Sequence, residues 1–303
     1  MPDVSNLFQM QILLLVLMAA GVISAKTKIL NEQSRNSLSD LILSIFLPCN
    51  ILYSFFGTDS SRLPSLAILL VVSSGLLVIG FFLGKLLFRK CGVEQKKVLL
   101  YGTIISNANF LGNPIVESIF GIDALIYTAV YLIPIRVAIW TLGIAIFTGA
   151  SGSMKKVVLH PCLIATYLGF IVMFTGFRAP PMLSRIIVTL GSCTTPLSMI
   201  VVGSILGLVQ AKKLINGLTL YYSSIRLLFI PLLAMGIMLL IHPDPVVTGV
   251  AVILSGTPAP VTTAILASKY NSDSELAGKM VFMSTLLSIV TLPVLIWLLQ
   301  LVM

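Results

Sequence analysis

Ten apolar runs divide this chain from end to end, and they limit it to one class of fold. Each run is close to the roughly 20 residues that an α-helix needs to cross about 30 Å of membrane hydrocarbon. No connector is long enough to fold as a separate domain. The sequence therefore predicts an all-α polytopic membrane protein with ten transmembrane helices. The runs cover residues 7–25, 37–56, 65–88, 98–120, 124–149, 160–176, 183–209, 214–241, 246–268 and 277–302.

Composition supports a membrane setting and excludes several classes of soluble protein. Of the 303 residues, 57% are hydrophobic and only 10% are charged, whereas about 25% are charged in a typical soluble domain. A soluble enzyme, a disordered chain and a disulfide-stapled secreted domain are therefore excluded. The four cysteines form no CxxC pair, so we expect small buried side chains there and no metal site.

Basic residues are distributed unevenly between alternate connectors. The net charge is +9, and fourteen of the 19 Lys and Arg lie in or beside the connectors after runs 1, 3, 5, 7 and 9. Because cytoplasmic loops carry the excess of Lys and Arg, we expect both termini on the non-cytoplasmic side of a cell (inner) membrane. The positive charge thus reports topology, and no nucleic-acid partner is expected.

Prolines recur in the same order in the two halves of the chain. Pro48 and Pro114 lie in runs 2 and 4, and Pro196 and Pro258 lie in runs 7 and 9. Each half contains five runs, and this odd number gives the second half the opposite orientation in the membrane. Inverted repeats with interrupted helices are typical of secondary transporters. We therefore expect a 5+5 inverted repeat, with residues 1–150 and 151–303 as its halves. The alternative is that these prolines are harmless kinks, which are common in membrane helices.

The residues of run 4 disfavour a continuous membrane helix. Three amides, a glycine and a proline occur within eight residues, at Asn107, Asn109, Gly112, Asn113 and Pro114. Proline removes a backbone donor and clashes with the preceding turn. Irregular backbone at membrane depth is tolerated only inside protein or beside a wet cavity, so we expect a broken helix here that lines a substrate site.

Run 9 carries a matching interruption at Gly256, Thr257, Pro258 and Pro260. Two broken helices that cross would direct half-helix N-termini toward one central point. Those ends carry unpaired N–H groups and partial positive charge. The expected ligand is an anion such as a carboxylate, held by these residues and the amides of run 4.

Two arginines lie inside predicted spans, where a charge usually faces the interior with a partner. Arg136 lies about midway through run 5, and it could pair with a substrate carboxylate in bidentate geometry. The alternative is a structural ion pair with Glu117, and substrate could also compete with Glu117 for the arginine. Arg226 in run 8 could contact substrate or extend toward the cytoplasm.

Glu117 is the only acidic residue well inside a run. A buried carboxyl that binds and releases a proton could couple transport to protons, and the alternative is a fixed partner of Arg136. No nucleophile elbow, HExxH, P-loop or dinucleotide fingerprint occurs, so we expect no enzyme, no ATP-driven pump and no cofactor. The alternative from a different functional class is an intramembrane enzyme or a receptor-like binding protein.

The order of these landmarks resembles the auxin efflux carrier family, which includes plant PIN-type carriers and bacterial malate and malonate permeases. Asn107, Gly112, Pro114, Phe120 and Gly121 match the family's Asn-containing segment. The resemblance extends over essentially the whole chain. Other matching segments are TTPLSMIVVG at 194–203, TPAPVTTAILASKYN at 257–271 and TLP at 291–293, and Asp59, Arg136 and Arg226 fall near polar or charged family positions.

The resemblance implies a sodium/proton-antiporter-like fold, with the substrate beside the crossing broken helices 4 and 9. It implies a scaffold domain of runs 1, 2, 6 and 7, a transport domain of runs 3–5 and 8–10, elevator-type alternating access and a homodimer. Asp40 stands where members often have Lys or Arg, and the connector between runs 5 and 6 is the short GASGSMKK. The short connector is of the bacterial type and favours malate or malonate over auxin.

Three transport functions follow as alternatives. The first is a secondary-active or facilitative carrier of small carboxylates, with proton coupling. The second is a sodium-coupled organic-anion symporter, with oxygen ligands from Asn109, Thr257, Thr262 and Thr263. The third is an exporter of auxin-like aromatic carboxylates, which would need an apolar pocket as well.

Overall fold

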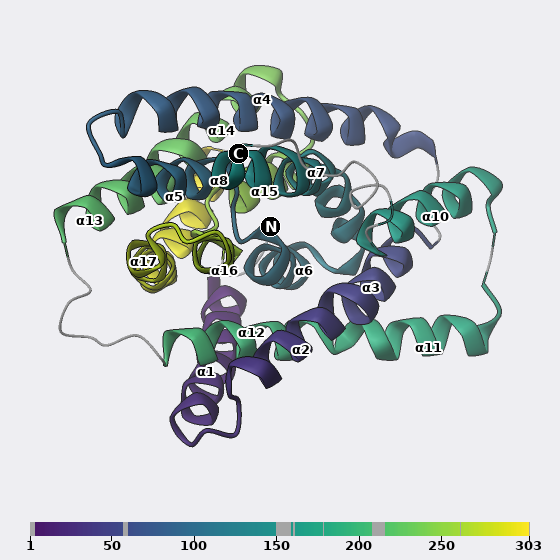
Figure 1. The fold of residues 1–303 in the computed structure, drawn as a ribbon. Coiled ribbons are helices and arrows are strands. Elements are labelled where there is room, and N and C mark those ends of the chain that lie inside the picture. The colour runs from purple at the N-terminus through teal and green to yellow at the C-terminus, as the bar shows by residue number, and fades with distance from the viewer. Residues whose placement is uncertain are drawn as a thin grey trace.

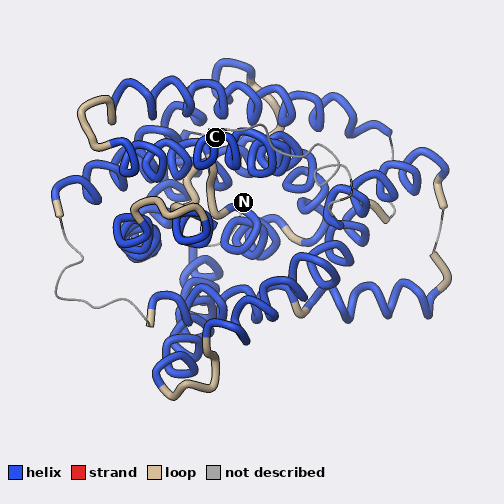
Figure 2. The backbone as a smooth tube through the Cα atoms, in the orientation of Figure 1, coloured by secondary structure: helices blue, strands red, loops and turns tan. Residues whose placement is uncertain are grey.

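A computed structural model describes residues 4–56, 60–149, 159, 161–177, 179–207, 216–260 and 262–302. Within these residues every regular element is a helix and no β-strand occurs, as Figure 2 shows. The all-α fold is therefore confirmed for the described part of the chain.

The helices follow the apolar runs in order along the chain (Figure 1). In the first half they are α1 (Val4–Lys26), α2 (Glu32–Leu41), α3 (Leu47–Ser54), α4 (Leu63–Leu87), α5 (Val93–Ile104), α6 (Asn113–Phe120), α7 (Leu125–Ala138) and α8 (Ile144–Thr148). In the second half they are α10 (Pro161–Thr175), α11 (Pro181–Ser192), α12 (Thr194–Leu206), α13 (Gly217–Ser224), α14 (Ile230–Ile241), α15 (Pro245–Ser255), α16 (Thr262–Lys269) and α17 (Ser274–Val302).

Six helical stretches in the described residues are long and apolar enough to cross a membrane. Four other predicted runs fall outside this set: α10 has only 15 residues, runs 4 and 9 are interrupted, and only the Val16–Lys26 part of α1 counts as a shorter apolar helix. A multi-pass membrane protein is supported, while the ten-span count stays a prediction. The six stretches are Glu32–Tyr53, Leu63–Leu87, Ile122–Thr148, Pro181–Ser204, Gly217–Ile241 and Ser274–Val302.

Both interruptions are present in the backbone. Helix α5 ends at Ile104, and Ile105 is extended, with φ −99° and ψ 139°. Helix α15 ends at Ser255, and regular helix resumes at Thr262. The break in run 4 therefore precedes Gly112 and Pro114 instead of lying at them.

Several prolines expected to break helices are accommodated by widened π-helical turns. Such turns, η1 (Ile42–Phe46), η3 (Ala108–Gly112) and η7 (Ile225–Phe229), each end two residues before a proline, at Pro48, Pro114 and Pro231. In each turn the residue before the proline donates its N–H to the carbonyl five positions earlier. The prediction that Pro48 and Pro114 interrupt their helices is therefore wrong, because the wider turn absorbs the proline ring. Pro196 likewise lies within α12, whereas Pro258 and Pro260 do lie in the break of run 9.

The helices pack into two groups. In the first, which we call the α12 group, α1 packs along α12, and α3 packs against α10 and α11. In the second, the α17 group, α4 packs against α5 and α7, and α17 packs against α13, α15 and α16. In Figure 1, α11 and α12 run along the bottom, α4 crosses the top and α6 lies between them.

Glycines bring α1 and α12 into direct backbone contact. A Cβ on Gly203 would meet the carbonyl oxygen of Met18, and a Cβ on Gly21 would meet that of Ile200. In a membrane, small residues allow helices to approach closely, and dispersion contacts then hold them together. This packing makes α1 and α12 a firmly joined pair.

Candidate functional site

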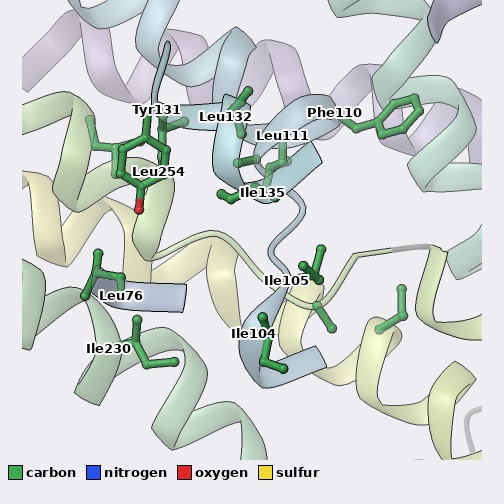
Figure 3. Close-up of a cluster of buried hydrophobic side chains, with 14 of the residues drawn as sticks. Leu76, Ile104, Ile105, Phe110, Leu111, Tyr131, Leu132, Ile135, Ile230 and Leu254 are labelled. Atoms are coloured by element: carbon green, nitrogen blue, oxygen red, sulfur yellow. The ribbon is translucent and has the colours of Figure 1, made fainter. Parts of the chain in front are cut away.

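The two helix breaks meet at the centre of the protein. The backbone N–H of Asn107 donates to the carbonyl oxygen of Pro258 at 2.9 Å, which joins the break of run 4 to that of run 9. The hydroxyl of Ser106 donates to the carbonyl of Leu254 at 3.4 Å. Figure 3 shows the irregular backbone between Ile105 and Leu111 beside the apolar side chains of this region. The predicted meeting of the breaks is therefore present as a contact.

Gly112 sets how closely the two chains approach. A Cβ on Gly112 would lie 2.5 Å from a methyl of Leu254 and 3.3 Å from the methyl of Thr257. Beside it, Asn113 donates its side-chain N–H to the carbonyl of Asn109 at 3.1 Å. Residue 112 must therefore be small for η3 to pack against the end of α15.

Arg136 lies fully buried beside this meeting point, with 2% of its surface exposed. Its Nη2 donates to Oδ1 of Asn109 at 3.2 Å, and its Nη1 donates to the carbonyl of Ala129 at 3.3 Å. Its Nε has no hydrogen-bond partner. The guanidinium also lies near the side chain of Cys162 on α10, where the two helix groups face each other.

No carboxylate of the described residues forms an ion pair with Arg136. In the described residues the ion pairs are Lys97–Glu94 and Lys279–Glu275. The ion pair between Arg136 and Glu117, which was the alternative to a substrate role for Arg136, is therefore absent. A guanidinium carries a permanent positive charge and five donors, and an unpaired buried charge is costly. Asn107 is also buried, with its side-chain Nδ2 unpartnered. Donors for an anion are therefore available at this site.

Arg226 is equally buried, at 3% exposed, and does not extend toward solvent. Its Nε donates to the carbonyl of Thr257 at 3.1 Å, just past the C-terminal end of α15, where a cation is favoured by the helix dipole. A cavity of about 20 Å³ beside it is lined in part by Tyr131, Ser106 and Ser255. That volume accommodates a water molecule and is too small for a dicarboxylate, so the cavity beside Arg226 has no room for such a ligand in this conformation.

Glu117 lies on α6 but faces the α12 group. Thr195 on α12 donates its hydroxyl to a carboxylate oxygen of Glu117 at 3.5 Å, and Asn50 on α3 forms a second side-chain hydrogen bond to it. Sequence reasoning missed both partners, because no spacing places α3 and α12 beside α6. Asp59 lies outside the described residues, so the structure does not locate it.

Other polar contacts that the sequence did not indicate hold the breaks in place. Within the break of run 9, the backbone N–H of Ala259 donates to the hydroxyl of Ser284 on α17 at 3.0 Å. The hydroxyls of Tyr101 and Thr262 lie 2.8 Å apart and share a hydrogen bond. Isolated Ser, Thr and Tyr residues in apolar helices carry no distinguishing pattern, which is why these partners were not predicted.

Comparison with known sequences identifies a family of membrane transport proteins. The profile of a family described as "Membrane transport protein" matches residues 7–158 and 151–296 of this chain. Among curated relatives, an "Uncharacterized transporter" of Methanothermobacter thermautotrophicus is 28% identical over 288 residues, covering 92% of this chain and 94% of the relative. An uncharacterized transporter of Methanocaldococcus jannaschii is 26% identical over 305 residues, covering 95% and 97%. A "Putative malonate transporter" of Rhizobium meliloti is 23% identical over 249 residues, covering 78% and 76%.

Proposed function

The chain belongs to the membrane transport protein family, as its resemblance to the auxin efflux carriers predicted, and on this premise we propose that it carries small organic anions. It would act as a secondary-active or facilitative carrier of carboxylates such as malonate or malate. One observation carries the proposal: Arg136 is buried beside the meeting point of two broken helices, and no carboxylate in the described part of the chain pairs with it. The family names and the absence of a catalytic motif favour transport over catalysis.

The chemistry of the site suits a small carboxylate. The unpartnered Nε of Arg136 and Nδ2 of Asn107 are hydrogen-bond donors, and a hydrogen bond to a charged group contributes about 1.5–3 kcal/mol. The Rhizobium meliloti relative is named for malonate, which agrees with this class. An aromatic carboxylate such as an auxin is the alternative, and it would add contacts to the apolar side chains of Figure 3.

The packing supports an elevator-type mechanism. We propose that the α12 group is the scaffold domain and the α17 group the transport domain, related through a 5+5 inverted repeat. Most strong helix contacts fall within one group or the other. The proposed substrate site moves with the α17 group, because Arg136 lies on α7 and the turn η3, which carries Asn109, packs against α15 as well as against α12. A homodimer in the cell membrane with both termini outside completes the proposal.

Sodium coupling is disfavoured by the oxygens that it would need. Oδ1 of Asn109 accepts from Arg136, and the carbonyl of Thr257 accepts from Arg226. The hydroxyl of Thr262 is hydrogen-bonded to Tyr101. The hydroxyl of Thr263 is buried without a hydrogen-bond partner, so one of the four oxygens stays available. With the other three engaged and two guanidinium charges close by, we propose proton coupling or uniport instead of sodium symport.

A ligand screen by thermal shift tests the proposal. A ligand that prefers the native state raises its melting temperature, and a concentration of about 100 times Kd contributes about 2.7 kcal/mol. We expect malonate or malate to raise the Tm of the purified protein by several degrees, and Arg136→Ala to remove that shift. Arg185→Ala, at an exposed position on α11, is the matched control and should keep the shift. If no carboxylate shifts the Tm, or if only aromatic acids do, the assignment to small carboxylates is wrong.

A further inference from the structure

Glu117 connects three helices that belong to different parts of the fold. Its carboxylate accepts hydrogen bonds from Thr195 on α12, at 3.5 Å, and from Asn50 on α3. Helix α6 follows the break of run 4 and packs against α7 and α15 in the α17 group. The three side chains therefore form a polar joint between the two helix groups.

The joint is only partly shielded from solvent, since Glu117 and Thr195 are half-buried, and the described residues supply no balancing charge. Asn50 is 4% exposed, and no Lys, Arg or His in the described residues lies within ion-pair distance of Glu117. Helices α12 and α15 and the turn η3 contribute no titratable side chain. Nearby elements contribute the titratable groups Asp123 on η4 (Ile122–Ala124), Tyr127, Tyr131 and Arg136 on α7, Lys26 on α1, and Cys49 and Tyr53 on α3.

The face of α12 at the joint has more hydrogen-bonding capacity than this conformation uses. Thr194, Thr195 and Ser198 lie within one face, because residues three and four apart are neighbours on a helix. The hydroxyls of Thr194 and Ser198 are buried and have no hydrogen-bond partner. Unpaired buried hydroxyls are costly, so they are explained if a polar group from α6 reaches them in a second conformation.

We propose that Glu117, Asn50 and Thr195 form a proton-controlled latch between the two helix groups. This inference rests on the proposed transport function and names the residue through which protons regulate it. Ionised Glu117 accepts both hydrogen bonds and holds the groups together. Protonation removes the charge that strengthens these bonds, and the α17 group is then free to move along the hydroxyl face of α12.

The size of the effect follows from the bonds involved. A hydrogen bond to a charged group exceeds a neutral one in strength by about twofold, and losing one changes an equilibrium constant by roughly 10- to 100-fold. Glu117→Gln keeps the shape of the side chain but removes its charge. Relative to the ionised wild type, it should therefore favour the open latch by up to that factor, and its latch should not respond to pH.

Hydrogen–deuterium exchange of the whole purified protein measures the latch without any need for transport. After correction for intrinsic exchange rates, peptides from α3 and α12 should become better protected in the wild type as pH rises. In Glu117→Gln, exchange should be faster and this pH dependence absent. Thr195→Val, which removes one donor at constant shape, should give a partial effect. Glu275→Gln, at an exposed residue paired with Lys279, and Thr189→Val on α11 are the matched controls.

The outcomes separate the latch from the transport function. Equal pH dependence in the wild type and in Glu117→Gln overturns the latch, whatever the protein carries. Loss of α3 and α12 protection at all pH values without any wild-type pH dependence shows a merely structural contact and also overturns it. If exchange behaves as expected while no carboxylate is transported, the proposed substrate is wrong and the latch stands.

Discussion

Asn109 and Arg136 form the contact on which the proposed chemistry depends. Oδ1 of Asn109 orients the guanidinium at 3.2 Å and brings no charge of its own. An uncharged partner leaves the positive charge of Arg136 available for a ligand, whereas a carboxylate partner would neutralise it. The amide is therefore the appropriate residue type at position 109 for an anion site.

Replacing the amide of Asn109 with a carboxylate should weaken the binding of anions at the site. Asn109→Asp places a negative charge beside Arg136, where it competes with the substrate anion. We expect carboxylate affinity to fall roughly 10- to 100-fold, the value of a hydrogen bond to a charged group. Binding measured by thermal shift or uptake gives the test.

Asn216→Asp is the control for that change. Asn216 caps α13 through its side chain, and Asp caps a helix equally well. It should leave binding unchanged. Unchanged affinity in Asn109→Asp would mean that Arg136 does not hold the anion.

At this scale, the sequence predicted which residues matter better than it predicted their partners. A lone Arg or Glu in an apolar run is conspicuous, and Arg136, Arg226 and Glu117 were all identified from that signal. Their partners depend on how distant helices pack, which residue spacing does not encode. The alternative that paired Arg136 with Glu117 is therefore wrong, and the contacts of Glu117 with Asn50 and Thr195 were not predicted.

Among the elements, the two broken helices depend on close contact at one glycine. Gly112→Ala puts a methyl against Leu254, which is fully buried. Overpacking of this kind costs about 1–3 kcal/mol. We expect a Tm lower by several degrees in a melting experiment, together with slower transport.

A control at Gly236 distinguishes the effect of overpacking at Gly112 from the effect of helix propensity. A Cβ on Gly236 in α14 meets nothing within 4 Å. Gly236→Ala should keep or raise the Tm, because Ala is the better helix former by about 1 kcal/mol. Equal Tm changes in both variants would argue against close packing at Gly112.

The sequence predicted the helix breaks to within a few residues, but it did not predict how the backbone accommodates each proline. Local clusters of Asn, Gly and Pro signal an interruption, and both interruptions are present. Whether a proline breaks a helix or is absorbed by a π-helical turn depends on hydrogen-bond register over the preceding turn. The turns before Pro48, Pro114 and Pro231 could not be predicted from composition.

For the molecule as a whole, the bias of basic residues predicts the orientation in the membrane. Cys91 is half-buried in the connector after run 3, which the bias assigns to the cytoplasm. With the other cysteines replaced, Cys91 should react with an impermeant maleimide in inside-out vesicles only. Met182→Cys, at an exposed position at the start of α11, should react only in right-side-out vesicles. The reverse pattern would invert the proposed topology.

The global arrangement was predictable in class but not in detail. Apolar runs and charge bias indicate a multi-pass helical protein, since they reflect the membrane itself. The division into two packed groups came only from the resemblance, because it depends on which apolar faces meet. Contacts such as Gly203 against Met18 look the same in sequence as any other small residue in an apolar helix.

Uptake of labelled malonate into proteoliposomes tests the central claim most directly. The wild type should accumulate or exchange malonate. Arg136→Ala should lose this activity although it still inserts and purifies, Arg136→Lys should recover part of it, and Arg185→Ala should match the wild type. Wild-type uptake by Arg136→Ala would contradict the claim that this buried arginine holds the carboxylate.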